Sequence, residues 1–345
     1  MKYYAKGLPW ASGIGKDVSD CITSREVIEK VGLDFDVKKC ELVARMPFNI
    51  AGNNDLNEDD FIHKGQIFRN CPNAFATYRT DYNIPLGIVK ARYEVIQNVD
   101  AFEFFNDAIE DGNAEWTKAG IFGVGQKIFI TAKIKNSMDI NGDHVDNYLV
   151  FSNSHDGSQS IDIMFTPIRV ACTNMLNGAR QMADVHIRIR HTKTAKEKLE
   201  EASRVLRIAC EYSEKAAETF KYLTTVQMSD IEVIKYFCKL ILSDAEFFEV
   251  GKLNNWGFEG LLHRNSTIIE NAGISTRKVN QIVSMYDYYK HGVAQEDIVG
   301  TAWGAYNAVT GYYCNVANLS GEKRMNSLLY GNAANVTAEA LAMVS

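Results

Sequence analysis

Hydrophobic and polar residues alternate most regularly between residues 127 and 135. The aliphatic positions in this segment are Ile128, Ile130, Ala132 and Ile134. The positions between them are Lys127, Phe129, Thr131, Lys133 and Lys135. Successive side chains of a strand point to opposite faces. The pattern therefore predicts a strand with one aliphatic side facing the core and one basic side that carries a single aromatic ring.

Further strands and two helices are predicted around this segment. Strands at 146–153 and 160–166 should continue it as a meander, because Asn141-Gly142 and Asp156-Gly157 are typical of tight turns. Strand-like runs at 75–82 and 88–97 predict an earlier hairpin, followed by a short helix at 101–109. Thr166-Pro167 predicts the start of a second helix that reaches Met182, since a hydroxyl residue caps helices and proline is favoured at the first helical position. The resulting β-β-α-β-β-β-α order predicts an α+β fold with helices on one face of an antiparallel sheet.

The two ends of the chain differ from this central part. Residues 1–22 should form an extended arm, and Thr23 with Glu26 has capping-box spacing for a short helix that ends at Gly32, before a strand at 37–48. Helical periodicity from Thr194 onward predicts a mostly helical region, with helices at 194–223, 229–248, 275–290, 301–316 and 336–344. We therefore divide the chain into an N-terminal arm with a small α/β segment (1–70), an α+β sheet core (71–193) and a helical C-terminal region (194–345).

Charge is distributed unevenly along the chain. The formal net charge is −6, so nucleic-acid binding would have to use a local basic patch. The densest such patch is at 186–198, where five Lys/Arg and one Glu give a local balance of +4 and leave −10 for the rest. This cluster favours phosphate contacts, although a solvated connection between the sheet and helical regions would have the same composition.

The basic sheet side and the basic cluster together predict a nucleic-acid interface. Proteins that bind single strands combine a basic groove with aromatic rings on which bases stack. The candidate binding residues are Lys127, Phe129, Lys133, Lys135, Arg169, Arg188, Arg190, Lys193, Lys196 and Lys198. Tyr148 and Arg180 could extend this set, and ordinary amphipathic strands with solvated lysines are the alternative. The prediction requires the sheet lysines and the 186–198 cluster to share one face.

Other motifs do not predict catalysis or a cofactor. Gly120–Gly125 has the glycine spacing of a phosphate-binding loop, but it lacks the Gly-Lys-Ser/Thr ending and precedes a strand. His155-Asp156 fits a turn, and the acids at 55–60 fit a solvated loop. The aromatic run from Trp303 to Tyr313 fits core or oligomer contacts. We expect no metal, no cofactor and a protein that acts without catalysis.

The cysteines and the hydropathy predict the compartment. The seven cysteines are scattered and odd in number, which indicates free thiols in a reducing cytoplasm and disfavours a zinc site. The first nine residues do not resemble a signal peptide. No segment approaches the roughly 20 apolar residues of a membrane span. We expect a cytoplasmic protein without a membrane partner.

Several segments resemble the phage/plasmid-like protein family, a domain of unknown function common in phage and plasmid genomes. They are Leu8-Pro9-Trp10 with Gly13 and Gly15, Gly32–Val37, Tyr93–Asn98, Asn153–Ser158, Phe165–Val170 with Cys172, Asn174 and Leu176, and Gly300–Thr310. The segment beginning at Phe165 is the most specific. The family often has a histidine after Pro-Trp, where this chain has Ala11, so no role of that histidine is carried over. The resemblance implies a mobile-element context and no particular chemistry.

The predicted element order is also similar to the core of single-strand annealing proteins related to the eukaryotic recombination annealase. Those proteins form oligomeric rings or filaments that hold single-stranded DNA in a basic groove. The leading hypothesis is therefore a phage or plasmid protein that binds and anneals single-stranded DNA as a homo-oligomer. The alternatives are a protein-interaction factor that blocks or redirects a host defence or replication protein, and a structural assembly protein.

Overall fold

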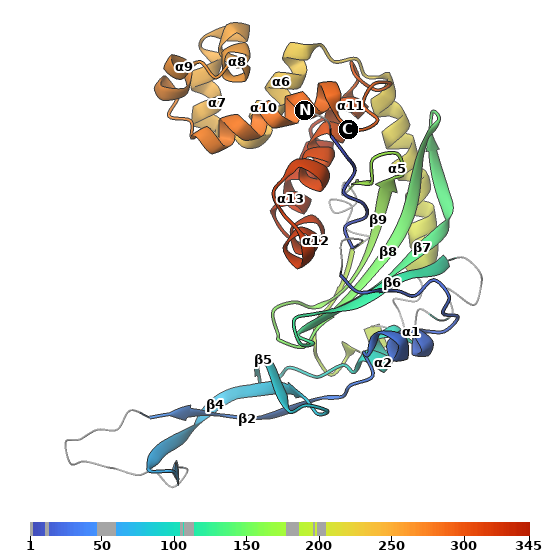
Figure 1. Cartoon of the computed structure of the whole chain (residues 1–345), viewed down its shortest axis with the longest axis vertical. Helices are drawn as coiled ribbons and strands as arrows, with labels where there is room; N and C mark the ends of the chain where they lie inside the picture. Colours follow the sequence, from blue (N-terminus) through green and yellow to red (C-terminus); the bar gives the residue numbers. More distant parts are fainter. Residues whose placement is uncertain are drawn as a thin grey trace, which may run out of the picture.

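The computed structural model describes residues 3–10, 14–46, 60–103, 106, 114–176, 186–195, 197–198 and 205–345. Figure 1 shows a curled antiparallel sheet in the middle, a helical region at one end and a β arm that projects from the other end. An antiparallel sheet followed by a mostly helical C-terminal region confirms the predicted α+β class.

The central sheet is built around the predicted meander. Its described strands follow the order β1-β6-β7-β8-β9-β10, and β11 also pairs with β9. The strands are β1 (Lys16–Asp17), β6 (Ala114–Phe122), β7 (Lys127–Ile140), β8 (Asp143–Ser154), β9 (Ile161–Arg169), β10 (Asn174–Met175) and β11 (His186–Ile189). Asn141 and Gly142 join β7 to β8 with positive φ angles of 54° and 91°, as a two-residue hairpin turn requires.

The predicted helix start at Thr166-Pro167 is wrong, because β9 continues through both residues to Arg169. All nine residues of β9 are buried, so its apolar run reflects burial on both faces rather than helical periodicity. Threonine before proline favours extended backbone, and the carbonyl oxygen of Pro167 accepts a hydrogen bond from the Leu176 amide at 2.8 Å. The part of the predicted helix at 177–182 lies outside the described residues.

Strand β6 was not predicted, and it joins the N-terminal segment to the sheet. Lys16 and Asp17 of β1 pair with Ala119 and Lys118 of β6. A Cβ atom added at Gly120 would lie 2.5 Å from the Cα of Gly15. Glycine at both positions therefore allows the two backbones to approach this closely.

The predicted hairpin at 75–97 belongs to a second sheet, which forms the projecting arm. This sheet has the order β2-β4-β3, with β5 paired to β4. Its strands are β2 (Val37–Arg45), β3 (Asp60–His63), β4 (Gln66–Arg79) and β5 (Ile84–Lys90). β4 continues across the predicted division at residue 70. The Thr77 hydroxyl donates to the His155 carbonyl at 2.6 Å and ties the base of the arm to the central sheet.

Two short helices lie between β1 and β6 along the chain. The predicted capping box forms between Thr23 and Glu26 at the start of α1 (Ser24–Val31), and Gly32 ends the helix with φ 74°. Of the helix predicted at 101–109, the structure describes α2 (Asn98–Phe102).

The helical region includes the long helix α5 (Val205–Thr225). It continues with α6 (Asp230–Ile241), α7 (Asp244–Gly251), α8 (Asn254–Leu262), α9 (Ser266–Asn271), α10 (Thr276–His291), α11 (Ala302–Gly311), the π-helical turn η3 (Tyr312–Val316), α12 (Gly321–Leu329) and α13 (Asn332–Ala342). The helix predicted at 229–248 is divided in two, because Ser243 and Glu246 form a second capping box that starts α7. None of the helices in the described parts of the chain is both long and apolar enough to cross a membrane.

Both faces of the central sheet are covered. On one face, Phe151 packs against Phe102 of α2 and Phe165 against Tyr212 of α5, with ring centroids 4.7 and 5.5 Å apart. On the other face, Trp10 of the N-terminal segment packs against Tyr148 at 5.3 Å, and the hydroxyl of Tyr330, which follows α12, hydrogen-bonds the Ser152 hydroxyl of β8 at 2.7 Å. The second face is where the basic side chains were predicted.

Candidate nucleic-acid interface

The register of the central sheet decides which candidate residues share a face. Phe129 of β7 lies opposite Ser152 of β8, Ser152 lies opposite Asp162 of β9, and Asp162 lies opposite Arg188 of β11. Directly opposed residues of antiparallel strands point to the same face. Lys127 and Lys133 are two and four residues from Phe129 along β7, so these two lysines and Arg188 lie on one face, as the prediction requires.

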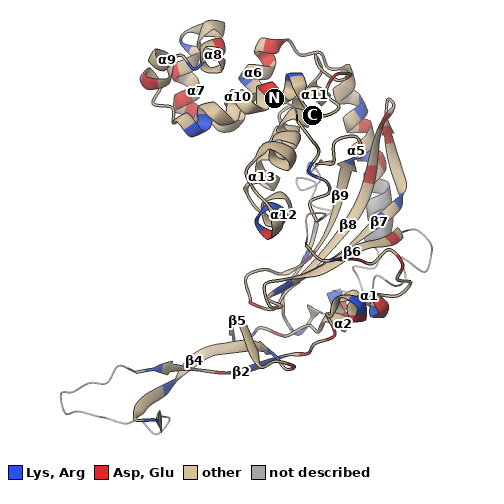
Figure 2. Cartoon of the chain, in the orientation of Figure 1, with Lys and Arg blue, Asp and Glu red and all other residues tan. Residues whose placement is uncertain are grey.

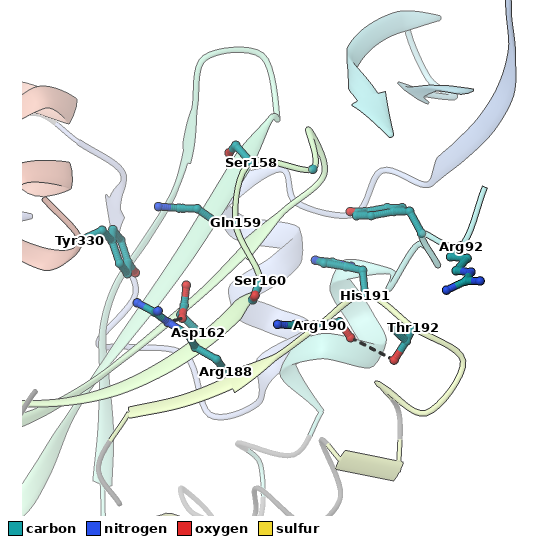
Figure 3. Close-up of a pocket in the computed structure, with 12 residues that line it drawn as sticks. Arg92, Ser158, Gln159, Ser160, Asp162, Arg188, Arg190, His191, Thr192 and Tyr330 are labelled. Carbon is teal, nitrogen blue, oxygen red and sulfur yellow. Dashed lines mark hydrogen bonds and ion pairs between the residues drawn. The ribbon is translucent and has the colours of Figure 1, made fainter. Parts of the chain in front are cut away.

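A pocket of about 510 Å³ opens beside β11, next to this face. It is lined by residues from the loop after β5, the β8–β9 turn, β9, β11 with the following turn, and the end of α12. These residues are Arg92, Tyr93, Gly157, Ser158, Gln159, Ser160, Asp162, Arg188, Arg190, His191, Thr192 and Tyr330. Figure 3 shows Tyr330 and His191 on opposite sides of the pocket, with Asp162, Arg188 and Ser160 between them.

The described cationic side chains of the 186–198 cluster are exposed, and two of them, Arg188 and Arg190, line this pocket. Arg188 Nε donates to the Asp162 carboxylate at 3.1 Å, although its side chain is 61% exposed while that of Asp162 is 5% exposed. Arg190, Lys193 and Lys198 are exposed, and no carboxylate of the described residues lies within ion-pair distance of them. Lys196 lies outside the described residues. Arg92 adds an exposed guanidinium on the side of the pocket where His191 lies, opposite Tyr330.

His191 is held in a single tautomer at the pocket wall. Its Nδ1–H donates to the Glu94 carbonyl at 3.1 Å, and its ring stacks on Tyr93 with centroids 4.5 Å apart. Burial lowers the pKa of His191 to about 4, so the ring is neutral at neutral pH. Nε2 is then an acceptor, and it has no hydrogen-bond partner.

The lysines of β7 contribute less positive charge than the sequence suggested. Lys133 pairs with Asp146 at 2.7 Å, and Lys135 approaches Glu115 at 3.7 Å. Lys127 is half-buried. Figure 2 shows that basic and acidic residues are interspersed over the sheet rather than separated into one basic stripe. The exposed positive charge is therefore concentrated at β11 and the turn after it.

Two candidate residues are buried and cannot contact a nucleic acid in this structure. Phe129 is fully buried, and its ring packs on Phe122 at 5.2 Å rather than being available to a base. Arg169 is 3% exposed, and its Nε donates to the Asp143 carboxylate at 2.5 Å. The structure contradicts both predictions, for different reasons. Phe129 is enclosed on the face that carries Arg188, whereas Arg169 is an odd number of residues from Asp162 along β9 and points to the opposite face, where its partner Asp143 also accepts a hydrogen bond from Trp303. Tyr148 is likewise buried, at 6% exposed, and Arg180 lies outside the described residues.

The remaining motifs have structural roles. His155 is fully buried and its Nε2 lies 2.8 Å from Asn98 Oδ1, while the Asp156 carboxylate accepts hydrogen bonds from Ser154 and Ser158 within the turn. Trp303 and Tyr306 are core residues. The six cysteines whose side chains are described are free.

Residues 120–125 form the end of β6 and part of the turn that precedes β7. Of the acids at 55–60, all but Asp60 lie outside the described residues. Within the described ranges, no group of three or more His, Cys, Asp or Glu side chains could hold a metal ion.

Sequence reasoning missed several pocket residues. Arg92 and Tyr330 are separated by more than 200 positions and belong to no charge cluster, so only the folded chain brings them together. Ser158 lies in a segment that carried the family resemblance, which is the one signal that could have singled it out.

Comparison with known proteins finds a matching family model. A family model described as Domain of unknown function (DUF932) matches residues 85–335, a segment that contains the pocket and reaches from β5 into α13. No curated protein and no solved structure matches the chain. Because the family model covers well over half of the chain, this protein belongs to the Domain of unknown function (DUF932) family.

Proposed function

We propose that this protein binds single-stranded DNA along β11 and the adjoining pocket, and that it anneals complementary strands without catalysis. The observation that carries the proposal is the row of exposed cations, Arg188, Arg190 and Lys193, beside a pocket lined by hydroxyl and aromatic side chains. Guanidinium groups bind phosphates in a forked geometry, and aromatic rings accept bases of any sequence. The phage or plasmid context and the homo-oligomeric state belong to the same proposal. The context rests on the family resemblance described above, and the oligomeric state rests on the similarity of the predicted element order to single-strand annealing proteins.

A salt series tests the electrostatic part of the proposal. We expect a labelled single-stranded oligonucleotide to bind more tightly than the matching duplex, with a logarithmic slope against salt of roughly −0.7 per phosphate contact, or about −2 for three contacts. Arg190→Gln should lower the affinity and reduce the slope by about 0.7. Arg277→Gln is the matched control, because this exposed arginine lies on α10, outside the pocket lining. Equal binding by both variants, or binding that ignores salt, would contradict the proposal.

Two further measurements address annealing and assembly. Complementary labelled strands should anneal faster with the wild-type protein than with Arg190→Gln. Light scattering without the oligonucleotide should give a mass at least twice the 38.7 kDa of one chain. A monomer that binds the strand but does not accelerate annealing would leave only the binding part of the proposal.

A second candidate function is a protein-interaction factor that blocks or redirects a host protein. The aromatic C-terminal helix no longer supports it, because Trp303 is buried. The β arm does, because it leaves Ile62, Tyr82 and Ile88 between 61% and 70% exposed, and exposed apolar groups of this kind mark contact surfaces. After nuclease treatment, host lysate should then yield one stoichiometric partner that is lost with Ile62→Ser/Ile88→Ser. Unchanged recovery with that variant would count against this role for the arm.

A further inference from the structure

The pocket offers an acceptor as well as cations. His191 is 7% exposed and its Nε2 atom has no hydrogen-bond partner. In Figure 3 its ring reaches into the pocket on the side opposite Tyr330. A buried acceptor without a donor is rare in folded proteins, and a ligand that donates a hydrogen bond would satisfy it.

A simple anion does not match this arrangement. Phosphate alone would satisfy Arg188 and Arg190, but it has no flat ring to lie against Tyr330, and the phosphodiester group of a strand brings no donor to His191 Nε2. A nucleoside alone would supply donors and an apolar ring, but it would leave the cations without an anion. The pocket therefore matches a molecule that has three parts: a phosphate for the two arginines, a flat ring for Tyr330 and a hydrogen-bond donor for His191 Nε2.

We propose that the pocket takes one unpaired nucleotide. Its phosphate lies against Arg188 and Arg190, its base lies against the ring of Tyr330, and an N–H or hydroxyl group of the nucleotide donates to His191 Nε2. The volume of about 510 Å³ is within the range of pockets that enclose small ligands. This inference rests on the proposed function and names the unit of the strand that the site holds.

The inference explains how the site would prefer single strands. A base in a duplex is paired and stacked, so it would have to leave the helix before it could enter the pocket. A single strand has no pairing to lose. The Tyr330 hydroxyl also hydrogen-bonds the Ser152 hydroxyl at 2.7 Å, which fixes the ring over the sheet before a ligand arrives.

Calorimetric titration of the full-length protein tests the inference with three probes: a deoxynucleoside 5′-monophosphate, the matching nucleoside and inorganic phosphate. We expect the monophosphate to bind at least ten-fold more tightly than either of the others. His191→Phe should weaken monophosphate binding at least five-fold and leave phosphate binding unchanged. Tyr330→Ala should do the same, and it serves as the second variant should the loss of the His191–Glu94 hydrogen bond unfold the protein. Arg190→Gln should weaken both phosphate-containing probes.

The outcomes separate the inference from the proposed function. Equal binding of monophosphate and phosphate, or monophosphate binding unaffected by Tyr330→Ala, would overturn the nucleotide pocket. If the oligonucleotide binds in an Arg190-dependent manner while the monophosphate does not bind at millimolar concentration, the pocket inference fails and the proposed function stands. If the monophosphate binds as expected and the oligonucleotide does not, the pocket inference stands and the proposed function fails.

Discussion

Arg324 should hold the N-terminal segment to the helical region. The side chain is 2% exposed, and its guanidinium donates five hydrogen bonds of 2.9–3.3 Å to the carbonyl oxygens of Gly7, Leu8, Pro9 and Cys314. The hydrogen-bond partners of the guanidinium are therefore backbone carbonyl groups. Burial lowers the pKa of Arg324. Residues 7–9 lead directly to Trp10, which covers the sheet.

Replacing Arg324 with methionine removes these five donors and keeps an apolar chain of similar length. At about 1 kcal/mol per bond the loss is roughly 5 kcal/mol, and the relief of burying a guanidinium without a carboxylate offsets part of it. We expect a net loss of about 3 kcal/mol in the free energy of unfolding. With an unfolding entropy of about 2.1 cal/mol/K per residue, this lowers the midpoint of a 345-residue chain by about 4 °C.

Calorimetry and limited proteolysis measure this effect. The midpoint should fall, and trypsin should cleave after Lys6 faster, because the segment around it is released. Lys323→Met is the matched control, since this neighbouring lysine is exposed and should change neither quantity. A midpoint for Arg324→Met equal to that of the control would refute the role assigned to the arginine.

Three other substitutions or conditions test the buried groups. Asp143→Ala leaves the guanidinium of Arg169 buried without its carboxylate and should cost about 3–5 kcal/mol in urea unfolding; a neutral effect would mean that Arg169 is not held as described. Phe129→Ala should cost about 3–5 kcal/mol but leave oligonucleotide affinity unchanged below its unfolding midpoint, whereas lost affinity would restore a stacking role. Burial lowers the pKa of His155 to about 3 and of His191 to about 4, so the unfolded chain binds more protons below about pH 6.5. Stability should therefore fall as the pH drops from 6.5 towards 4, by about 2 kcal/mol per histidine at pH 5, and a thermal midpoint independent of pH over this range would contradict it.

The period-two pattern of β7 predicted one side of the strand correctly and misjudged the other. Ile128, Ile130, Ala132 and Ile134 are buried as expected. Phe129 on the other side is also buried, because its ring packs on Phe122 and the N-terminal segment, whose Trp10 lies against Tyr148, crosses that face. Which segment returns to cover a sheet depends on contacts across more than a hundred residues, and local alternation does not contain that information.

The error at β9 has a different physical origin. A strand buried on both faces loses its alternation, so the apolar run ending at Ile168 could equally be assigned to a helix. Local capping signals then favoured the helix. The capping box of α1 and the hairpin at Asn141-Gly142 were predicted correctly because short-range hydrogen bonds and positive φ angles determine them without tertiary contacts.

The candidate site was predicted in the part where charge density alone is informative. Arg188, Arg190 and Lys193 are exposed, as a cluster rich in cations and poor in acids suggests. The partner of Arg188 is Asp162 of a neighbouring strand, so a linear charge count could not include it. The effective charge of the site depends on the sheet register, because the register places Asp162 opposite Arg188.

That register leads to a prediction of increased affinity. Asp162 competes with phosphate for Arg188, so Asp162→Asn should release the guanidinium while preserving the size of the side chain. Because Arg188 is 61% exposed, the pair is screened by solvent and is worth about 0.2–1 kcal/mol. Oligonucleotide affinity at moderate salt should therefore rise by up to about five-fold.

Asp146→Asn separates this local effect from the change in net charge. It removes the same charge from the same face of the sheet, but it releases Lys133, which does not line the pocket. If the affinity rises equally with both substitutions, the increase comes from the change in the net charge of the protein. In that case the pocket is not where phosphates bind. If Asp162→Asn weakens binding instead, the carboxylate orients Arg188 for the ligand rather than competing with it, and the site depends on the ion pair being intact.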